Sequence, residues 1–351
     1  MIVRLLAMLA ALFPILLGSP AHAQSESVQS DSAVVIMYHR FGDDRYPSTN
    51  IRLEQFEAHV QELLSGGYTV LPIPEIIRRQ QGGESLPDRT VGLSIDDAYL
   101  SVYAEAWPRL RDAGLPFTLF VSTGGVDQGL ADIMSWDQIR EMVDGGGVTI
   151  GAHTRTHLHM PDFGPTRLSK ELAESNARYK AELGITPTVF AYPYGEASSD
   201  VVSLVKEHGY TAAFGQHSGA FDSQDFAYYL PRFPLNEKFG DMGRFKTAVN
   251  ALAMSVTDIT PENMSIPASA PAPAMGFTLR KALPRSNLLS CFLSHEGKAE
   301  IIRLGDTRIE VRVETPFPAG RVRLNCTLPG SGKNAGRWHW FGQQYYQLKG
   351  E

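Results

Sequence analysis

The stretch VGLSIDDAYLSVY, residues 91–103, shows the unit from which most of this chain is built. Residues 91–95 form a mainly apolar run typical of a buried strand, and a helix-like segment begins after the next two residues. Those two residues are Asp96 and Asp97, adjacent carboxylates at the point where the strand leaves the core. Two like charges at such a point either cap the following helix or share a bound cation.

The same unit recurs across residues 33–255. Amphipathic, helix-like segments separate further apolar runs, which occupy residues 34–38, 69–73, 117–121, 147–151, 188–192 and 211–215. Strands that alternate with helices predict parallel βα units, and so an α/β fold. The number of units favours a barrel-like closure over an open sheet, and the residues alone do not decide between the two.

The composition changes after residue 255. Residues 256–276 include the Pro/Ala-rich stretch SIPASAPAPAMG and are predicted to be a linker. Short alternating runs such as RVRLNCTL then predict a small all-β, sandwich-like module over residues 277–351. The chain's two cysteines, Cys291 and Cys326, both fall in it. In an oxidising compartment they are expected to form a disulfide, the alternative being two separate buried thiols.

The N-terminus has the pattern of a secretory signal peptide. Arg4 precedes the apolar residues 5–17, and Ala21-His22-Ala23 is an A-x-A cleavage site, so residues 1–23 are expected to be removed. The apolar run is short for a membrane span, which needs about 20 residues. The sequence therefore predicts an exported protein, periplasmic or extracellular, without a stable membrane span.

The charge balance argues against nucleic acid as a partner. The chain has 32 basic and 38 acidic residues, which give a formal net charge of −6. A nucleic-acid-binding protein is expected to carry a basic excess. The sequence has no signal for an oligomeric state.

Polar residues follow several of the predicted strands. In βα barrels the carboxyl ends of the strands meet on one face, which carries the active site. Side chains that follow different strands are therefore expected to meet there, and they are His39, Asp96, Asp97, His153, His157, Pro193, Tyr194 and His217.

Two of these histidines have the spacing of metal ligands. His153 and His157 are separated by one helical turn, at i and i+4, so both can reach one ion. Two histidines and one carboxylate form a common metal-binding set with an open position for water. One of Asp96 and Asp97 would complete the set, and the other would stay free as a base.

Three motifs carry a resemblance to a known family. SIDDAY, HTRTHLHM and FAYPYG resemble TFDDG, HSxxHP and RxPYG, the leading motifs of polysaccharide deacetylases, the NodB-like domains of carbohydrate esterase family four. The resemblance covers roughly residues 33–240. VVIMYHRF and YYLPRF also resemble the branch of exported poly-N-acetylglucosamine deacetylases. The family implies a distorted (β/α)7 barrel and hydrolytic removal of acetyl groups from an N-acetylated polysaccharide.

The resemblance also assigns roles. Asp96 matches the general base, and Asp97, His153 and His157 match the ligands of a divalent metal, usually Zn²⁺. That metal would polarise the acetamide carbonyl and activate water. The backbone N–H of Tyr194 would help to hold the oxyanion.

Other positions depart from the family or have two interpretations. Ala98 replaces the glycine after the two aspartates, which suggests a slightly different turn, and Ala191 replaces the motif arginine that holds the base. We hypothesise that Arg232 takes over this role. The late Leu-x-His motif that supplies the catalytic acid has no clear match, and His217 is the candidate. His39 either lines the pocket or fills the barrel mouth.

Several alternatives stay open. Pro193 and Tyr194 form either a wall of the substrate site or an ordinary turn. The same site would also suit another N-acyl substrate, such as a peptidoglycan sugar or a non-sugar amide. The altered motifs would also fit a non-catalytic carbohydrate-binding or assembly protein. The aromatic residues near the C-terminus form either the core of the β module or a sugar-stacking surface, and they are Trp338, Trp340, Phe341, Tyr345 and Tyr346.

Overall fold

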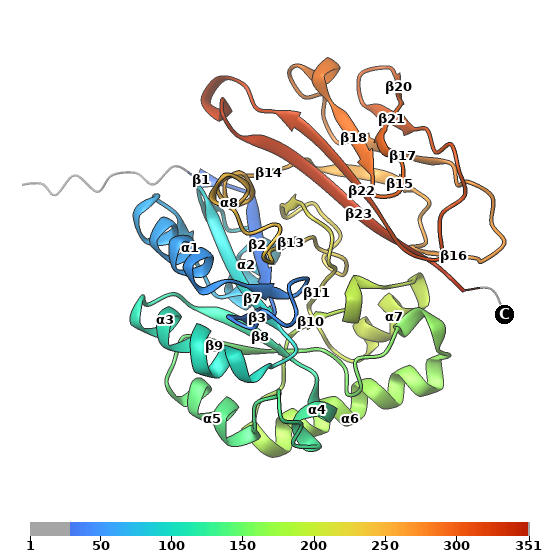
Figure 1. Ribbon diagram of the computed structural model, residues 1–351. Coiled ribbons are helices and arrows are strands. Elements are labelled where there is room, and N and C mark those ends of the chain that lie inside the picture. The colour runs from blue at the N-terminus through green and yellow to red at the C-terminus, as the bar shows by residue number, and fades with distance from the viewer. Residues whose placement is uncertain (1–28, 350–351) are drawn as a thin grey trace, which may run out of the picture.

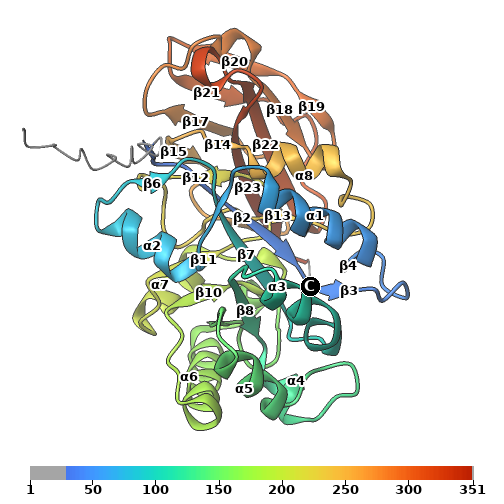
Figure 2. The ribbon, with the colours of Figure 1, turned by 90° about the vertical axis from the view of Figure 1, so that its left-hand side faces the viewer.

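The computed structural model describes residues 29–349, so the predicted signal peptide lies outside the described residues. The chain forms a curled, mainly parallel sheet surrounded by helices, called the barrel below, and a group of C-terminal strands, called the β module (Figure 1). The β module runs from β14 (Leu252–Ala253) to β23 (Trp338–Gln347). In both views the β module stacks on one end of the barrel (Figures 1 and 2). None of the helices in the described part combines the length and apolarity that a membrane crossing needs.

All seven predicted apolar runs contribute strands to the barrel sheet. In spatial order its main strands are β11 (Ala212–Phe214), β10 (Val189–Ala191), β9 (Val148–Ala152), β8 (Phe117–Val121), β7 (Thr90–Asp96), β2 (Ala33–Tyr38) and β12 (Ala220–Phe221). Two short strands pair in parallel at its side, β5 (Thr69–Val70) with β7 and β13 (Phe233–Pro234) with β2. Among the described residues no strand pairing closes the sheet between β11 and β12. The predicted (β/α)7 fold is thus confirmed as a curled, incompletely closed barrel.

The central strands are mainly apolar on both faces because both faces of the sheet are covered. β2 and β7 pair in parallel from Ala33–Thr90 to Tyr38–Ile95. Alternate residues of β2 enter two different apolar clusters, Val34 in one and Val35 in the other. Parallel strands buried on both faces have continuous rather than alternating apolar sequences, which is why these strands were visible in the sequence.

Helices connect successive strands on the outside of the sheet (Figure 1). A π-helical turn (Val102–Ala106) leads directly into α3. α5 starts with a capping box in which Ser135 and Gln138 each bond the other's backbone N–H. The helices are α1 (Leu53–Ser65), α2 (Ile73–Gln81), α3 (Trp107–Asp112), α4 (Thr123–Asp127), α5 (Trp136–Asp144), α6 (Pro165–Leu183), α7 (Ser199–Glu207) and α8 (Met242–Val249).

The β module consists of two packed sheets with an apolar cluster of their own. The sheet that faces the barrel contains β14 (Leu252–Ala253), β16 (Ser265–Ile266), β18 (Ser290–Leu293), β19 (Gly297–Ala299), β22 (Gly320–Pro329) and β23 (Trp338–Gln347). The other contains β15 (Val256–Thr260), β17 (Met275–Leu279), β20 (Ile301–Leu304) and β21 (Arg308–Val311).

Residues 256–276, which the composition predicted to be a linker, contain strands. This range holds β15, β16 and the first residues of β17. Only residues 267–274 combine the Pro/Ala-rich composition with an absence of strands, because proline lacks the N–H that a sheet ladder needs. We therefore propose that the β module begins at β14.

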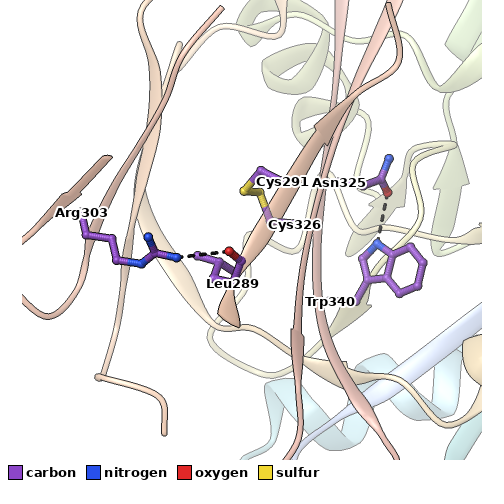
Figure 3. Close-up of a disulfide and its surroundings, with 6 residues drawn as sticks. All are labelled: Leu289, Cys291, Arg303, Asn325, Cys326 and Trp340. Carbon is purple, nitrogen blue, oxygen red and sulfur yellow. Dashed lines mark hydrogen bonds between the residues drawn. A yellow bond between two sulfur atoms is a disulfide. The ribbon is translucent and has the colours of Figure 1, made fainter. Parts of the chain in front are cut away.

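Cys291 and Cys326 form the expected disulfide (Figure 3). They are direct cross-strand partners in β18 and β22, so the bond joins two strands of one sheet rather than the two sheets. Figure 3 shows Asn325 extending from β22 on the side opposite to Cys326, with its amide oxygen accepting a hydrogen bond from Trp340 Nε1 (3.1 Å). Alternate residues of β22 thus face the sandwich core and the barrel.

The aromatic residues near the C-terminus divide between these environments. Phe341 and Tyr345 belong to the core cluster of the β module, as one interpretation predicted. Trp340 packs edge-on against Phe233 of the barrel, with ring centroids 5.1 Å apart. Trp338 is 40% exposed and belongs to neither core. These side chains therefore do not form one continuous stacking surface.

Candidate metal and catalytic site

The carboxyl ends of the barrel strands bring the predicted site residues to one edge. β7 ends at Asp96, β9 ends one residue before His153, and β2 ends one residue before His39. β10 leads into a turn that contains Pro193 and Tyr194. Parallel strands share their direction, so residues distant in sequence converge there, as the alternation of strands and helices predicted.

Asp97, His153 and His157 point at one another. Asp97 Oδ1 lies 3.3 Å from His153 Nε2 and 3.2 Å from His157 Nε2. Within the described chain these three form a group that could hold an ion, with their ligand atoms all within 4.8 Å of one another. Asp97 Oδ1 and His153 Nε2 are buried and have no hydrogen-bond partner. Buried polar atoms without partners are costly, and a cation between them would remove that cost.

A hydrogen bond sets the tautomer of His153. Its Nδ1 lies 2.7 Å from the backbone oxygen of Ala191, so Nδ1 carries the proton and donates it. Nε2 is then left with a free lone pair, which is the form in which imidazole binds a metal. Ala191 thus takes part in the site through its carbonyl oxygen, although its side chain departs from the family motif.

The two histidines lie on a loop, not on the helical turn that their spacing suggested. Thr154 and His157 have positive φ angles of 60° and 55°. The buried carboxylate of Glu171, on α6, holds the loop by accepting hydrogen bonds from the N–H groups of Arg155 (3.2 Å) and Thr156 (2.9 Å). The Thr156 hydroxyl donates a third (2.9 Å). The i, i+4 spacing predicted that the two side chains meet but not this conformation.

The aspartate turn has the same unusual backbone. Asp97 and Ala98 have φ angles of 74° and 53°, in the left-handed region that favours glycine. Ala98 therefore adopts a backbone conformation that favours glycine, the residue that it replaces in the motif. Non-glycine residues in this region store strain and concentrate at functional sites.

Asp96 is held by Arg232. The guanidinium donates from Nη1 to Oδ1 (2.7 Å) and from Nη2 to Oδ2 (2.8 Å), and both side chains are fully buried. Nε of Arg232 donates to the backbone oxygen of Gly215 (3.0 Å), which fixes the plane of the guanidinium. Burial would raise the pKa of Asp96, but Arg232, with His153 and His39, holds it below its usual range. Asp96 is thus a carboxylate.

His39 faces this pair, whereas His217 does not. His39 Nε2 lies 3.9 Å from Asp96 Oδ2, and its side chain is part of the cleft wall. His217 is 1% exposed and packs on Tyr229, with ring centroids 4.8 Å apart. Gln216 and Ser218 line the cleft on either side of it in sequence, but His217 itself does not. The structure therefore contradicts the placement of His217 as the catalytic acid.

Comparisons with known proteins decide the family. Residues 83–213 match the polysaccharide deacetylase family. The chain contains a polysaccharide deacetylase domain. This is a family of hydrolases that act on amide bonds, as the three sequence motifs predicted.

Individual relatives agree with this assignment. A poly-beta-1,6-N-acetyl-D-glucosamine N-deacetylase of Staphylococcus aureus strain MRSA252 is 24% identical over 199 residues, which cover 54% of this chain and 68% of that protein. The solved structure of IcaB from Ammonifex degensii has 27% identity and a TM-score of 0.55, covering 63% of this chain and 98% of that one. The Streptococcus pyogenes deacetylase PplD, solved with acetate, shares the fold, with 20% identity, a TM-score of 0.58 and coverage of 62% and 98%.

The Pro-Tyr-Gly turn of the deacetylase domain is held by the β module. Tyr194 has a φ angle of 59° and lines the cleft, while Pro193 is buried. Gln344, on β23, donates from Nε2 to the backbone oxygens of Tyr194 (3.0 Å) and Gly195 (2.8 Å). The Tyr229 hydroxyl donates to the Gly195 oxygen as well (2.7 Å). The turn is thus fixed from both sides.

A cleft of about 890 Å³ lies over the deacetylase site. This volume is within the range of ligand pockets, roughly 300–1,000 Å³. His39, Asp97, His157 and Tyr194 line it from the barrel, and Arg321, Arg323 and Asn325 line it from β22. Sequence reasoning missed the β22 residues, as well as Glu171 and Gln344, because no motif marks them. The alternation in RVRLNC shows only that three polar residues share one face of a strand.

Proposed function

We propose that this chain removes acetyl groups from an N-acetylglucosamine-containing polysaccharide by metal-dependent hydrolysis. One observation carries the proposal: the Asp97–His153–His157 group lies beside Asp96, whose two oxygens are both held by Arg232. A metal set beside an ordered carboxylate base is what amide hydrolysis needs. The N-acetylglucosamine unit is taken from the name of the Staphylococcus aureus relative.

Asp97, His153 and His157 would hold the divalent metal. Their donor set, one carboxylate oxygen and two imidazole nitrogens, suits Zn²⁺, the metal usual for the family that the motifs resemble. When bound, the metal supplies a Lewis acid for the acetamide carbonyl and for the attacking water. The buried Asp97 Oδ1 and His153 Nε2, which lack other partners, support this assignment.

Asp96 would act as the general base. Arg232 keeps it ionised and holds its carboxylate in one orientation. In that state an oxygen of Asp96 accepts the proton of the attacking water. Arg232 acts through Asp96 and is a positioning residue, in the place of the motif arginine that Ala191 has replaced.

His39, rather than His217, would supply the catalytic acid. It is the imidazole that lines the cleft on the side of Asp96, with Nε2 directed to the carboxylate. In this position it would donate a proton to the leaving amine nitrogen as the C–N bond breaks. The backbone N–H of Tyr194 would stabilise the oxyanion, supported by the fixed turn around it. Export of the mature chain stays a prediction from residues 1–23.

The test is acetate release from an N-acetylglucosamine oligomer. Metal-stripped protein is assayed with and without added Zn²⁺, beside an Asp96→Asn variant, and bound metal is measured by elemental analysis. We expect release that requires both the metal and Asp96. Zn²⁺-dependent release that persists in Asp96→Asn would remove Asp96 as the base.

Two outcomes would point to other functions. A tightly bound metal without acetate release would indicate a different N-acyl substrate. A protein that neither binds a metal nor releases acetate would be a non-catalytic carbohydrate-binding protein.

A further inference from the structure

The charged lining of the deacetylase cleft is mainly cationic. The chain as a whole has a formal net charge of −6, yet the cleft is lined by four arginines and one carboxylate, Asp97, which belongs to the metal-binding group. The arginines are Arg155, Arg244, Arg321 and Arg323. Because the chain as a whole is negative, its composition does not account for a positive cleft. The charge of the cleft instead indicates that the ligand is negative.

Arg323 is the arginine in the cleft wall that most clearly lacks a counter-charge. Arg155 pairs with Glu174 (2.8 Å), and Arg321 lies 3.7 Å from Glu196, which His159 also contacts (2.6 Å). Over residues 29–349 no carboxylate lies within ion-pair distance of Arg323. Its Nε is buried without a hydrogen-bond partner. Burial, followed by the neighbouring Arg321, lowers the pKa of Arg323 and outweighs the opposing effects of Tyr229 and of Glu196, which does not reach ion-pair distance.

Arg244 also has a buried Nε without a partner, but its guanidinium lies over the Phe239 ring, 5.0 Å from the centroid. That aromatic face gives it a partial substitute for an anion. Arg323 has no comparable aromatic contact among the described side chains. It is therefore the better candidate for a ligand contact.

The position of Arg323 relative to the reacting centre is fixed. Arg323 pairs across the strands with Gln344, which bonds the turn of Tyr194 and Gly195. Two residues further along β22, Asn325 pairs with Gly342, where a Cβ would overlap the backbone oxygen of Ser218. Only glycine allows β23 to approach the barrel so closely. The β22 side chains are thus held at a set distance from the oxyanion turn.

We propose that Arg323, with Arg321 and Asn325, forms a subsite for a carboxylate carried by the substrate polymer on a sugar beside the one that is deacetylated. The proposal rests on the proposed function and narrows its substrate class to an anionic polymer. A guanidinium binds a carboxylate through two parallel hydrogen bonds. The amide oxygen of Asn325 is occupied by Trp340 Nε1, which leaves its NH₂ group as a donor. A wholly neutral polymer would leave Arg323 uncompensated.

The test is direct binding to the full mature chain, loaded with Zn²⁺, in the Asp96→Asn background that prevents turnover. Calorimetry compares a neutral N-acetylglucosamine tetramer with two carboxylated tetramers, one alternating with N-acetylmuramic acid and one with glucuronic acid. We expect at least one carboxylated tetramer to bind roughly tenfold to a hundredfold more tightly than the neutral one at low salt, as a charge-assisted pair allows. The two carboxylated probes distinguish a lactyl from a uronic source.

Variants assign the difference to Arg323. Arg323→Gln should remove most of the preference for the carboxylated tetramer, and Arg323→Lys should keep part of it. The matched control is Arg312→Gln, an exposed arginine of the same module outside the cleft, which should keep it all. Thermal unfolding confirms that each variant is folded.

Equal binding of all three tetramers, or a preference that survives in Arg323→Gln, would overturn the subsite. Displacement of the carboxylated tetramer by equimolar free acetate would also overturn it, because the site would then bind the product. Acetate release by the wild-type protein is assayed separately. A carboxylate preference without acetate release would contradict the proposed function and leave the subsite standing.

Discussion

At the residue scale, the contact between Arg232 and Asp96 gives the first prediction. Arg232→Lys keeps a positive charge beside a fully buried carboxylate but loses the two-point contact. We expect kcat to fall by about 10²-fold or more, because a base that is free to rotate loses its alignment. Zn²⁺ binding, measured by competition with a chelator, should stay unchanged. Full turnover in this variant would show that Arg232 does not position the base.

The two candidate acids give the second prediction. His39→Gln should lower kcat by roughly 10²–10⁴-fold, the usual contribution of a general acid. His217→Gln should keep the kcat of the folded fraction, because His217 faces Tyr229 and not the cleft. Both variants are assayed at equal concentrations of folded, metal-loaded protein. A larger loss of kcat in His217→Gln than in His39→Gln would restore His217 as the catalytic acid.

The sequence predicted which residues meet at the carboxyl ends of the barrel strands better than it predicted where their side chains point. It brought Asp97, His153 and His157 together and proposed the partner of Asp96 correctly. It failed for His217 because a position after a strand fixes a place along the sheet edge and not a side-chain direction. Gln216 and Ser218 line the cleft, whereas His217 between them is buried against Tyr229. His39, with two interpretations open, faces the cleft.

At the element scale, the loop of residues 153–157 gives the third prediction. The Glu171 carboxylate accepts three hydrogen bonds from this loop. Glu171→Gln leaves one acceptor oxygen, so we expect Zn²⁺ affinity to fall by about 10–100-fold, as for other groups that orient metal ligands. Glu174→Gln is the matched control on the same helix, since Glu174 binds the side chain of Arg155 and not the loop backbone. Equal affinities in the two variants would contradict the role of Glu171.

Strand β23 gives the fourth prediction. Gln344→Ala removes the two hydrogen bonds that its amide donates to the backbone oxygens of Tyr194 and Gly195 and leaves the one from Tyr229. We therefore expect kcat to fall about tenfold with unchanged metal content, because part of the support of the oxyanion site is lost. Gln347→Ala, on the same strand, loses a bond to Pro267 instead and should keep kcat. Parallel losses of kcat in both variants would indicate general loosening of the β module rather than a role in the turn.

At the scale of the whole molecule, the sequence predicted the two architectures but not how they share a site. Continuous apolar strands mark the barrel and alternating strands mark the β module, because each pattern follows from which faces are buried. Contacts between the parts depend on long-range geometry, such as Gly342 against Ser218. The assignment of residues 256–276 to a linker failed because proline-rich segments between strands resemble linkers in composition.

The fifth prediction concerns the stability of the whole fold in acid. Burial lowers the pKa of His217 to about 3, whereas the unfolded chain titrates near 6.5. Between these values the unfolded state binds a proton that the folded state does not, so the contribution of His217 to stability falls as pH decreases below about 6.5. The free energy of unfolding of the wild type should therefore fall relative to that of His217→Gln, by up to about 1.4 kcal/mol per pH unit.

The comparison with the variant is needed because another buried group acts in the opposite sense. Burial raises the pKa of Asp225 to about 7, so the folded state takes up a proton that the unfolded chain lacks, and this group gains stability as pH falls below 7. Both proteins contain Asp225, so its effect cancels in the difference. Urea unfolding of the two proteins at pH 7, 6 and 5 measures that difference. A constant difference across this range would show that His217 accepts a proton in the folded protein and is not sealed in the core.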